Sequence, residues 1–422
     1  MIKPSIIIIG AGATGLIAAK ELSPDFEVIV LEAQTRTGGR LHSVLHQENI
    51  IEAGAEFVHG DLPVTLGLLK EAGIAYVKIR GEMYRKKNGL LAKVEEMTEG
   101  WNGLLRKMNG LKDDITMREF LDKYYPGPAN ELLRSHVKSY AEGFDLADIN
   151  NASVKALHRE WNTEEHDNYR IRNGYGALSQ YLQQQAENGG AIIYTGKLIK
   201  EVQWQQGKVN VRAANGEKYT AEKLLVTVPV SVLQQPASKA YIHFTPAIHF
   251  NENVAADIGF GTVIKVILKF KNPFWQNDAG FILSNELFPT WWTQLPDKVP
   301  ILTGWLGGPG AEALSNETDA VIEQKALASV AAIFDRPVAE LIKELNMAMV
   351  FNWKKNEYAM GAYSYATIHS GAAIDIITAP LAGTIFFAGE ALYTGDHPGT
   401  VEAALVNGIN TSLAIKNAPL YF

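Results

Sequence analysis

The stretch Ile6-Ile7-Ile8-Ile9-Gly10-Ala11-Gly12-Ala13-Thr14-Gly15 decides the fold of this chain. Its four consecutive β-branched residues are typical of a parallel strand that is buried on both faces. Good helix formers follow from Leu16 to Leu22, and a second apolar run from Val28 to Leu31 ends at Glu32. The N-terminal residues therefore predict a compact strand–helix–strand unit whose first turn is rich in glycine.

The glycines of Gly10-x-Gly12-x-x-Gly15 each have a mechanical task at such a turn. The first permits the tight strand-to-helix turn, the second lets the backbone approach a pyrophosphate, and the third lets the helix pack closely on the strand. Glu32 follows Gly10 by 22 residues. At that spacing a carboxylate can accept hydrogen bonds from a ribose diol, and it repels a 2′-phosphate. A chance glycine-rich turn and a solvated strand end are the alternatives, but the combined pattern favours a dinucleotide site that disfavours NADP.

A second glycine-rich stretch, Arg36-Thr37-Gly38-Gly39-Arg40, comes shortly after the second predicted strand. Two glycines let the chain lie against a cofactor, and an arginine can pair bidentately with phosphate oxygens. A basic surface turn is the alternative interpretation. The stretch strengthens the prediction of a phosphate-bearing cofactor without naming it.

The composition is that of a globular chain and excludes several chemistries. Of its 422 residues 47% are hydrophobic, 39 are basic, 46 are acidic and none is cysteine. Without cysteine there is no disulfide, no thiolate nucleophile, no iron–sulfur cluster and no zinc site built on sulfur. The net charge of −7 argues against a large basic surface for nucleic acid or anionic lipid. No apolar stretch approaches the ~20 residues of a membrane span. We therefore expect a cytoplasmic protein with no metal site and no nucleic-acid or membrane partner.

The rest of the chain predicts alternating strand-rich and helix-rich segments. The residues from Lys208 to Pro229 alternate and turn at Asn215-Gly216, which predicts a hairpin. Strands are also predicted at 263–270 and 385–388, and helices at 117–185 and 322–345. Composition marks no clean boundary and no linker, which indicates two domains that interleave along the chain.

Several longer stretches have a recognisable pattern. They read GAGATGLIAAKEL from Gly10, LEAQTRTGGRLHS from Leu31, EAGAEFVHG from Glu52 and FFAGEALYTGDHPGTVEAALVNG from Phe386. Between them stand LLVTVPVSVL, GTVIKVILKF and NWKKNEYAMGAYSY, from Leu224, Gly261 and Asn352. Together they resemble, in the same order and over nearly the whole chain, the FAD-dependent amine oxidase family. That family includes flavin monoamine oxidases, polyamine oxidases, L-amino-acid oxidases and flavin-type histone lysine demethylases.

The resemblance implies an α/β fold with two domains. One is a Rossmann-like FAD-binding domain of the GR2 flavoprotein type, and the other is an α+β substrate domain with a mixed sheet and a helical insertion. In this family the FAD domain is assembled from three separated segments. We place them at 1–80, 174–236 and 378–422, which leaves 81–173 and 237–377 for the substrate-binding domain.

The resemblance also implies FAD as the cofactor. Ala362 stands where monoamine oxidases carry the cysteine that binds FAD covalently, so we expect non-covalent FAD. The family's cofactor-binding positions fall on Gly10, Gly12, Ala13, Thr14, Gly15, Glu32, Ala33, Arg36, Gly38, Gly39, Arg40, Gly54, Ala55, Glu56, Val202, Val228, Trp353, Gly389, Glu390, Gly399, Thr400 and Val401.

The implied reaction is the oxidation of an amine. A hydride equivalent passes from the α-carbon to flavin N5, the imine hydrolyses, and O2 reoxidises the flavin to give hydrogen peroxide. The partners are then a small-molecule amine and O2. The resemblance indicates Lys265 and Tyr363 as catalytic positions, although the strand pattern alone is also consistent with an outward lysine and a core tyrosine. It indicates His59, Tyr363 and Thr400 as substrate contacts.

The sequence leaves several points open. The Trp291-Trp292 pair could line the substrate cavity or fill the core, and Trp353 could pack near the flavin or be structural. The chain could also be a flavoenzyme of the desaturase or L-amino-acid oxidase type, or a flavin-binding protein without catalysis. The pattern names neither the amine nor the oligomeric state.

Overall fold

The structure is a computed structural model that describes residues 3–87, 89–94, 99–163 and 167–419. The chain divides into two compact units, each assembled from separated segments. The first unit comprises Met1–Val77, Thr163–Phe260 and Glu357–Phe422, and the second comprises Lys78–Asn162 and Gly261–Asn356. These bounds differ from those of the predicted domains, and the division into a cofactor domain and a substrate domain stays a prediction.

A five-stranded parallel sheet forms the centre of the first unit, in the order β10-β2-β1-β14-β23. Its strands are β1 (Ser5–Ile9), β2 (Glu27–Leu31), β10 (Ile192–Tyr194), β14 (Lys223–Val226) and β23 (Ile385–Phe387). The helix α1 (Ala13–Leu22) connects β1 to β2, which confirms the predicted strand–helix–strand unit. Because β1 is the central strand, its glycine-rich turn lies at the middle of the carboxyl edge, where ligands bind in doubly wound sheets.

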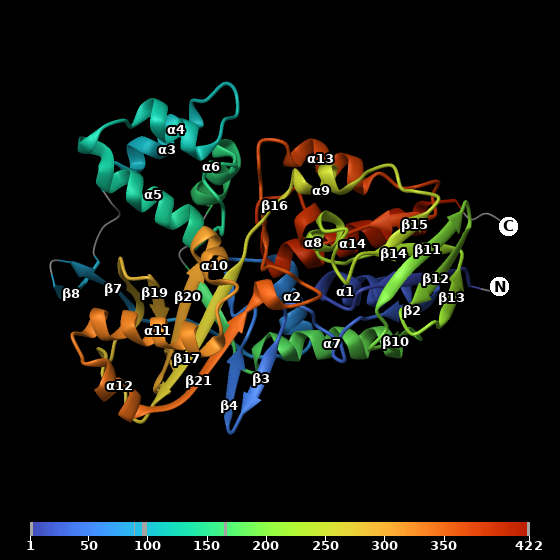
Figure 1. The fold of residues 1–422 in the computed structure, drawn as a ribbon. Coiled ribbons are helices and arrows are strands. Elements are labelled where there is room, and N and C mark those ends of the chain that lie inside the picture. Colours follow the sequence, from blue (N-terminus) through green and yellow to red (C-terminus); the bar gives the residue numbers. More distant parts are fainter. Residues whose placement is uncertain (1–2, 88, 95–98, 164–166, 420–422) are drawn as a thin grey trace. The chain divides into compact units, whose positions relative to one another are not determined.

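The two faces of this sheet are covered by different layers (Figure 1). Ile6 and Ile8 contribute to a core formed with α1, α7 (Gly174–Asn188) and α14 (Val401–Asn417). Ile7 and Ile9 contribute to a second core with the sheet β13-β12-β11-β15. That sheet consists of β11 (Ile199–Gln205), β12 (Lys208–Ala213), β13 (Lys218–Ala221) and β15 (His243–Thr245). The predicted hairpin is confirmed, because β12 and β13 pair antiparallel across Asn215-Gly216.

Smaller elements complete the first unit. They are the hairpin β3 (Ser43–His46) and β4 (Asn49–Glu52), the sheet β5 (Phe57–His59), β9 (Asn168–Ile171) and β6 (Tyr76–Lys78), and the pair β16 (Gly259–Phe260) and β22 (Ser364–Tyr365). The helices are α2 (Pro63–Glu71), α8 (Val230–Gln234), α9 (Glu252–Ala256), α13 (Ser370–Thr378) and the 3₁₀ turn η3 (Glu390–Leu392).

A seven-stranded mixed sheet forms the second unit, in the order β21-β17-β20-β19-β18-β7-β8. Its strands are β7 (Glu82–Lys87), β8 (Leu90–Lys93), β17 (Val263–Phe270), β18 (Ala279–Leu283), β19 (Thr290–Trp292), β20 (Ile301–Gly307) and β21 (Leu345–Asn352). The pair β18–β7 is parallel, and the other neighbouring strands are antiparallel.

Some helices of the second unit cover part of this sheet, and the others form a separate cluster. Ile264, Val266 and Leu268 of β17 lie in one core with side chains of α11 (Asp319–Phe334). Beside α11 are α10 (Gly308–Leu314) and α12 (Val338–Glu344). The helical cluster, teal to green in Figure 1, consists of α3 (Trp101–Asn109), α4 (Met117–Tyr124), α5 (Glu131–Gly143) and α6 (Val154–Thr163).

The two segments predicted to be mainly helical are confirmed, and each is interrupted once or more. The segment 117–185 contains α4, α5, α6 and most of α7, but β9 interrupts it because β9 pairs with the distant β5. The segment 322–345 is two helices, since α11 ends before Asp335, whose φ is +53°, and Pro337 precedes α12. Proline cannot continue a helix. The predicted strands at 263–270 and 385–388 are confirmed as β17 and β23.

Candidate active site

In the glycine-rich turn after β1, protein atoms pack closely against two of the glycines and leave space beside the third. Gly10 has a φ of +105°, and a Cβ on it would lie 2.8 Å from Thr227 Oγ1. A Cβ on Gly15 would lie 1.9 Å from the carbonyl oxygen of Gly10. A Cβ on Gly12 would meet no described atom within 4 Å. The fold therefore requires Gly10 and Gly15, whereas the space above Gly12 is free for a ligand.

The N-terminus of α1 faces this turn and carries the partial positive charge of a helix N-terminus. Among the described side chains none caps α1, and its first turn contains no acidic residue. The neighbouring α2 is different, because the buried carboxylate of Glu402 accepts hydrogen bonds from the amides of Val64 at 2.9 Å and Thr65 at 2.7 Å. A free helix N-terminus with exposed amides binds phosphate groups well.

The second glycine-rich stretch lies directly against the first. The amide of Gly38 donates to the carbonyl of Ala11 at 2.8 Å, and a Cβ on Gly39 would lie 3.3 Å from the Cα of Gly12. Arg36 holds the stretch in shape by donating to the carbonyls of Thr37 at 3.2 Å and Gly39 at 2.9 Å. The Arg36 guanidinium therefore binds backbone carbonyls of its own loop.

Glu32 directly follows β2 (Glu27–Leu31), lies beside the turn and is 6% exposed. Its Oε2 accepts from the amide of Ala11 at 2.7 Å, and its Oε1 accepts from the amide of Gln34 at 2.8 Å. Burial raises the pKa of this carboxyl, and the two amides and Arg36 oppose the shift. A carboxylate has about four acceptor sites, so Glu32 retains acceptor capacity for a ribose diol.

The partly exposed Arg40 and the buried Glu390 form an ion pair at the other end of the loop. Arg40 Nη1 donates to Glu390 Oε2 at 2.7 Å and to the carbonyl of Ala362 at 2.5 Å. Glu390 Oε1 accepts from the amide of Ser364 at 2.8 Å and from its hydroxyl at 2.5 Å. The pair thus joins residues on either side of Tyr363, and sequence reasoning missed Ser364.

Tyr363 lies against the loop that precedes α14. A Cβ on Gly399, whose φ is +70°, would lie 3.1 Å from Cδ2 of the Tyr363 ring. The hydroxyl of Thr400 donates to the carbonyl of His397 at 2.7 Å and accepts from the amide of Ala403 at 3.2 Å. Thr400 therefore caps α14, and Val401 is the first residue of that helix.

His59 and Glu56 lie on or beside β5. His59 Nδ1 is 2.6 Å from Oδ1 of Asn168, its direct partner across β9. Burial lowers the pKa of His59, and the Asn168 hydrogen bond opposes this shift. Glu56 is buried in an ion pair with Arg170 at 2.9 Å.

The remaining cofactor positions of the first unit lie on the same framework. The amide of Ala55, beside Gly54, donates to the carbonyl of Arg40 at 3.2 Å. The Thr14 hydroxyl donates to the carbonyl of Ala404 in α14 at 2.9 Å. Val202 is fully buried in β11, and a Cβ on Gly389 would lie 4.0 Å from the carbonyl oxygen of Val228. Ala13 begins α1, and Ala33 follows β2.

Lys265 lies in the second unit and is 1% exposed. Its Nζ is 5.5 Å from the centroid of the Trp292 ring, and Trp292 lies 5.9 Å from Trp305, the partner of Lys265 on β20. Trp291 occupies the opposite face of the sheet, where it fills the space above Gly304. The structure therefore separates the two tryptophans: Trp291 is a core residue, and Trp292 contacts Lys265.

Trp353 also belongs to the second unit. It is buried at the start of the 3₁₀ turn η2 (Trp353–Lys355), next to β17. Lys265 and Trp353 are thus placed by the second unit, whereas the other predicted site residues are placed by the first.

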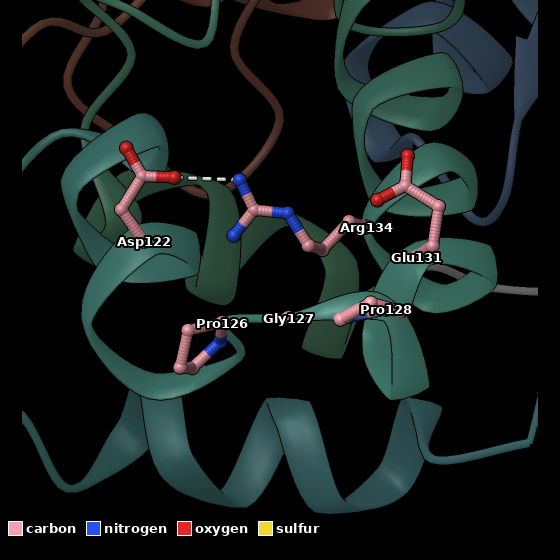
Figure 2. Close-up of a pocket in the computed structure, with 6 residues that line it drawn as sticks. All are labelled: Asp122, Pro126, Gly127, Pro128, Glu131 and Arg134. Carbon is pink, nitrogen blue, oxygen red and sulfur yellow. Dashed lines mark hydrogen bonds and ion pairs between the residues drawn. The ribbon is translucent and has the colours of Figure 1, made fainter.

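A pocket of about 460 Å³ lies elsewhere, in the helical cluster between α4 and α5 (Figure 2). It is lined by Asp122, Pro126, Gly127, Pro128, Glu131 and Arg134. Asp122 and Arg134 point toward each other and pair at 2.5 Å. No predicted site residue lines this pocket. Over the described ranges we find no group of three or more His, Asp or Glu residues arranged to hold a metal ion. Within the same ranges every helix is too short or too polar to cross a membrane.

Residues 13–416 match the family described as flavin containing amine oxidoreductase. The chain belongs to this family. It is 27% identical to human lysine-specific histone demethylase 2 over 451 residues, which cover 97% of this chain and 53% of that protein. It is 27% identical to lysine-specific histone demethylase 1 homolog 2 of Arabidopsis thaliana, over 99% of this chain and 59% of that protein. The chain thus spans little more than half the length of these relatives.

Solved structures of two amine oxidases share the fold. Putrescine oxidase bound to putrescine superposes with a TM-score of 0.80 at 19% identity, over 98% of this chain and 99% of that chain. Cyclohexylamine oxidase from Brevibacterium oxydans gives a TM-score of 0.80 at 18% identity, over 98% of both chains. The predicted α/β fold of a FAD-dependent amine oxidase is confirmed.

FAD is the cofactor of this family, and the residues of the first unit fit it. The free space above Gly12 and the uncapped N-terminus of α1 suit the pyrophosphate, because exposed amides and a positive helix end stabilise anions. The remaining acceptor capacity of Glu32 suits a ribose diol.

Proposed function

We propose that the protein uses FAD to oxidise a small-molecule amine, with O2 as the electron acceptor. The overall reaction converts amine, O2 and water into an aldehyde or ketone, ammonia or a smaller amine, and hydrogen peroxide. The observation that carries the proposal is the open space above Gly12, in a chain of the amine oxidoreductase family. When bound, FAD supplies the capacity to take up a hydride equivalent from a carbon next to nitrogen.

The first unit's part is to hold the cofactor without a covalent bond. The turn around Gly12 and the start of α1 bind the pyrophosphate, and Glu32 binds the ribose of the adenosine half. The Arg40–Glu390 pair stabilises the second glycine-rich loop, which lies against the first. Ala362 has no nucleophilic side chain with which to form a covalent link.

Three side chains act on the substrate side. The ring of Tyr363 forms an aromatic wall that excludes water and orients the amine nitrogen. His59, whose ring is fixed by the contact with Asn168, is the proposed polar contact for the substrate on β5. Lys265, buried beside Trp292, carries N–H groups that can donate hydrogen bonds to a water molecule.

The proposed substrate is a cationic small-molecule amine. Putrescine and cyclohexylamine oxidases share the fold, and the net charge of −7 attracts cationic amines. The relatives named histone demethylases support a second candidate, the oxidation of a methylated lysine in a peptide. In both cases the bond oxidised is C–N, so one assay serves for both.

The test is oxygen consumption by the purified holoenzyme with a panel of amines. The panel contains a diamine, a cyclic amine, an aryl-alkyl amine, an L-amino acid and a methyl-lysine peptide. We expect one class to consume O2 with an equal amount of hydrogen peroxide and of carbonyl product. Amine oxidation that reduces an artificial dye without consuming O2 would contradict the assignment of the acceptor.

A further inference from the structure

We propose that Ser364, together with the Arg40–Glu390 ion pair, positions the ring of Tyr363 in the active site. The inference rests on the proposed function, in which Tyr363 forms the aromatic wall for the amine. Ser364 is a positioning residue in this account, because it acts through its neighbour and through Glu390.

The contacts around Tyr363 form a closed circuit. Arg40 Nη1 donates to the carbonyl of Ala362, the residue before Tyr363. The amide and hydroxyl of Ser364, the residue after Tyr363, both donate to Oε1 of Glu390. The 2.7 Å ion pair between Arg40 and Glu390 closes the circuit. The backbone of Tyr363 is therefore held on both sides by one pair of opposite charges.

The strength of the circuit comes from the burial of Glu390, which is 4% exposed. A buried carboxylate needs its hydrogen-bond donors, because an unmet charge in a protein interior is costly. Hydrogen bonds to a charged group are also stronger than those between neutral groups. Each of the donors from Arg40 and Ser364 is thus held firmly, and Tyr363 between them has little backbone freedom.

Neighbouring contacts limit the ring of Tyr363 further. Upstream, the buried hydroxyl of Ser231 donates to the carbonyl of Ala359 at 2.6 Å, which anchors the approach to Tyr363. On the ring side, Gly399 leaves only enough room for Cδ2, since a Cβ there would lie 3.1 Å away. The ring is therefore restrained by the backbone at its base and by a close contact at its edge.

The circuit also joins the cofactor loop to the substrate side. Arg40 ends the stretch Gly38-Gly39-Arg40 that lies against the turn around Gly12. Its guanidinium lies 5.8 Å from the ring of Phe260, whose backbone pairs with Ser364 in the short sheet β16–β22. Ser364 is next to Tyr363 in the chain and is linked to the cofactor loop only through Glu390 and Arg40, so we expect Ser364→Ala to affect Tyr363 more than FAD binding.

The experiment compares Ser364→Ala, Ser364→Thr and the control Ser370→Ala as holoenzymes. Ser370 is a buried serine of the same unit, and its hydroxyl donates to the carbonyl of Asp257, outside the circuit. Under anaerobic conditions we expect Ser364→Ala to lower the limiting rate of flavin reduction by saturating amine about tenfold, with unchanged FAD content. Ser364→Thr keeps the hydroxyl and should stay within about threefold of the parent, as should Ser370→Ala.

A double-mutant cycle decides whether the effect passes through Tyr363. In a Tyr363→Ala background, Ser364→Ala should change the limiting rate by less than about twofold. The same tenfold loss in both backgrounds would overturn the proposal, because it would show that Ser364 acts independently of Tyr363.

A spectroscopic readout separates this proposal from the proposed function. With 3-fluorotyrosine in place of Tyr363, the holoenzyme should show one sharp fluorine resonance, and Ser364→Ala should broaden or split it. An identical sharp resonance in Ser364→Ala would overturn the positioning role. If no amine reduces the flavin of the parent protein, the proposed function fails, and the fluorine spectrum still decides the role of Ser364.

Discussion

The carboxylate of Glu32 accepts a 2.7 Å hydrogen bond from the backbone amide of Ala11, so the end of β2 is tied to the glycine-rich turn after β1. The carbonyl of the same Ala11 accepts from the amide of Gly38 at 2.8 Å. Ala11 thus connects the carboxylate of Glu32 with both glycine-rich stretches. These hydrogen bonds hold the turn and the second glycine-rich stretch in one fixed arrangement.

Substitutions at Gly12 and at Gly15 should distinguish an effect on FAD binding from an effect on stability. Gly12→Ala places a methyl group in free space at an ordinary φ of −75°, so the apoprotein should keep its stability within about 1 kcal/mol. The methyl group occupies the pyrophosphate position, and we expect the Kd for FAD to rise at least about tenfold, or ~1.4 kcal/mol. Flavin fluorescence titration and urea unfolding measure the two effects.

The matched variant Gly15→Ala should lower the stability of the apoprotein, which Gly12→Ala leaves nearly unchanged. Its methyl group would overlap the carbonyl oxygen of Gly10, so α1 must shift and the free energy of unfolding should fall by about 1–3 kcal/mol or more. Equal stability losses in the two variants would contradict the assignment of open space above Gly12.

Substitutions of Lys265 and Lys269 test whether the buried amine of Lys265 has a catalytic role. Both are on β17 and on the same face, but Lys265 is buried beside Trp292 and Lys269 is partly exposed. Lys265→Met should lower turnover or flavin reoxidation about 100-fold, within the range for loss of a proton-handling side chain, and leave FAD bound. Lys269→Met should behave like the parent protein. Parent-like stopped-flow kinetics in Lys265→Met would refute the assignment.

Trp291 and Trp292 are adjacent in the sequence and should have different roles. Trp291→Leu leaves a cavity above Gly304 and removes the 2.9 Å hydrogen bond to the carbonyl of Phe288, so it should cost about 3 kcal/mol of stability. Its kcat, measured below the unfolding transition, should be unchanged. Trp292→Leu removes the ring beside Lys265 and should lower kcat. Loss of kcat in Trp291→Leu alone would show that the wrong tryptophan was assigned to the site.

We expect Glu142 on α5 to make the stability of the protein depend on pH. Burial raises the pKa of its carboxyl to about 7, with Lys138 opposing, and its side chain is 17% exposed. Between pH 4.5 and 7 the folded chain holds a proton that the unfolded chain has released, so stability falls as pH rises through this window. Above pH 7 the loss is complete and amounts to at most about 3 kcal/mol.

Glu142→Gln cannot ionise and should therefore raise the thermal unfolding midpoint at pH 8 more than at pH 5. The exposed Glu131→Gln on the same helix is the control for the loss of one charge. A difference between the two pH values that is no larger for Glu142→Gln than for Glu131→Gln would exclude the burial effect.

Local patterns predicted the parts of the fold in which neighbours in sequence are neighbours in space. The strand–helix–strand unit around Gly10 and the hairpin at Asn215-Gly216 depend on short-range sterics and hydrogen bonds, and both are confirmed. The strand β9 was missed, because it is a strand only through pairing with β5, more than a hundred residues away in the sequence.

The site shows the same limit. The resemblance indicated Arg40 and Glu390. The proposed role of Ser364 depends on the carboxylate of Glu390, 26 residues away in the sequence, and no sequence pattern predicts that the two are in contact. The difference between Trp291 and Trp292 depends on Gly304 in the adjacent strand, which leaves room for one indole. A serine or glycine in a strand carries no local signal for such a partner.

The most direct test of the central claim is the absorbance spectrum of the purified flavoprotein, mixed without oxygen with each amine of the panel and then exposed to air. The account predicts a yellow protein whose flavin band is bleached by one class of amine and returns in air. A yellow protein that no amine bleaches would contradict amine oxidation. A colourless protein that cannot take up FAD would contradict the proposed FAD site at the turn around Gly12.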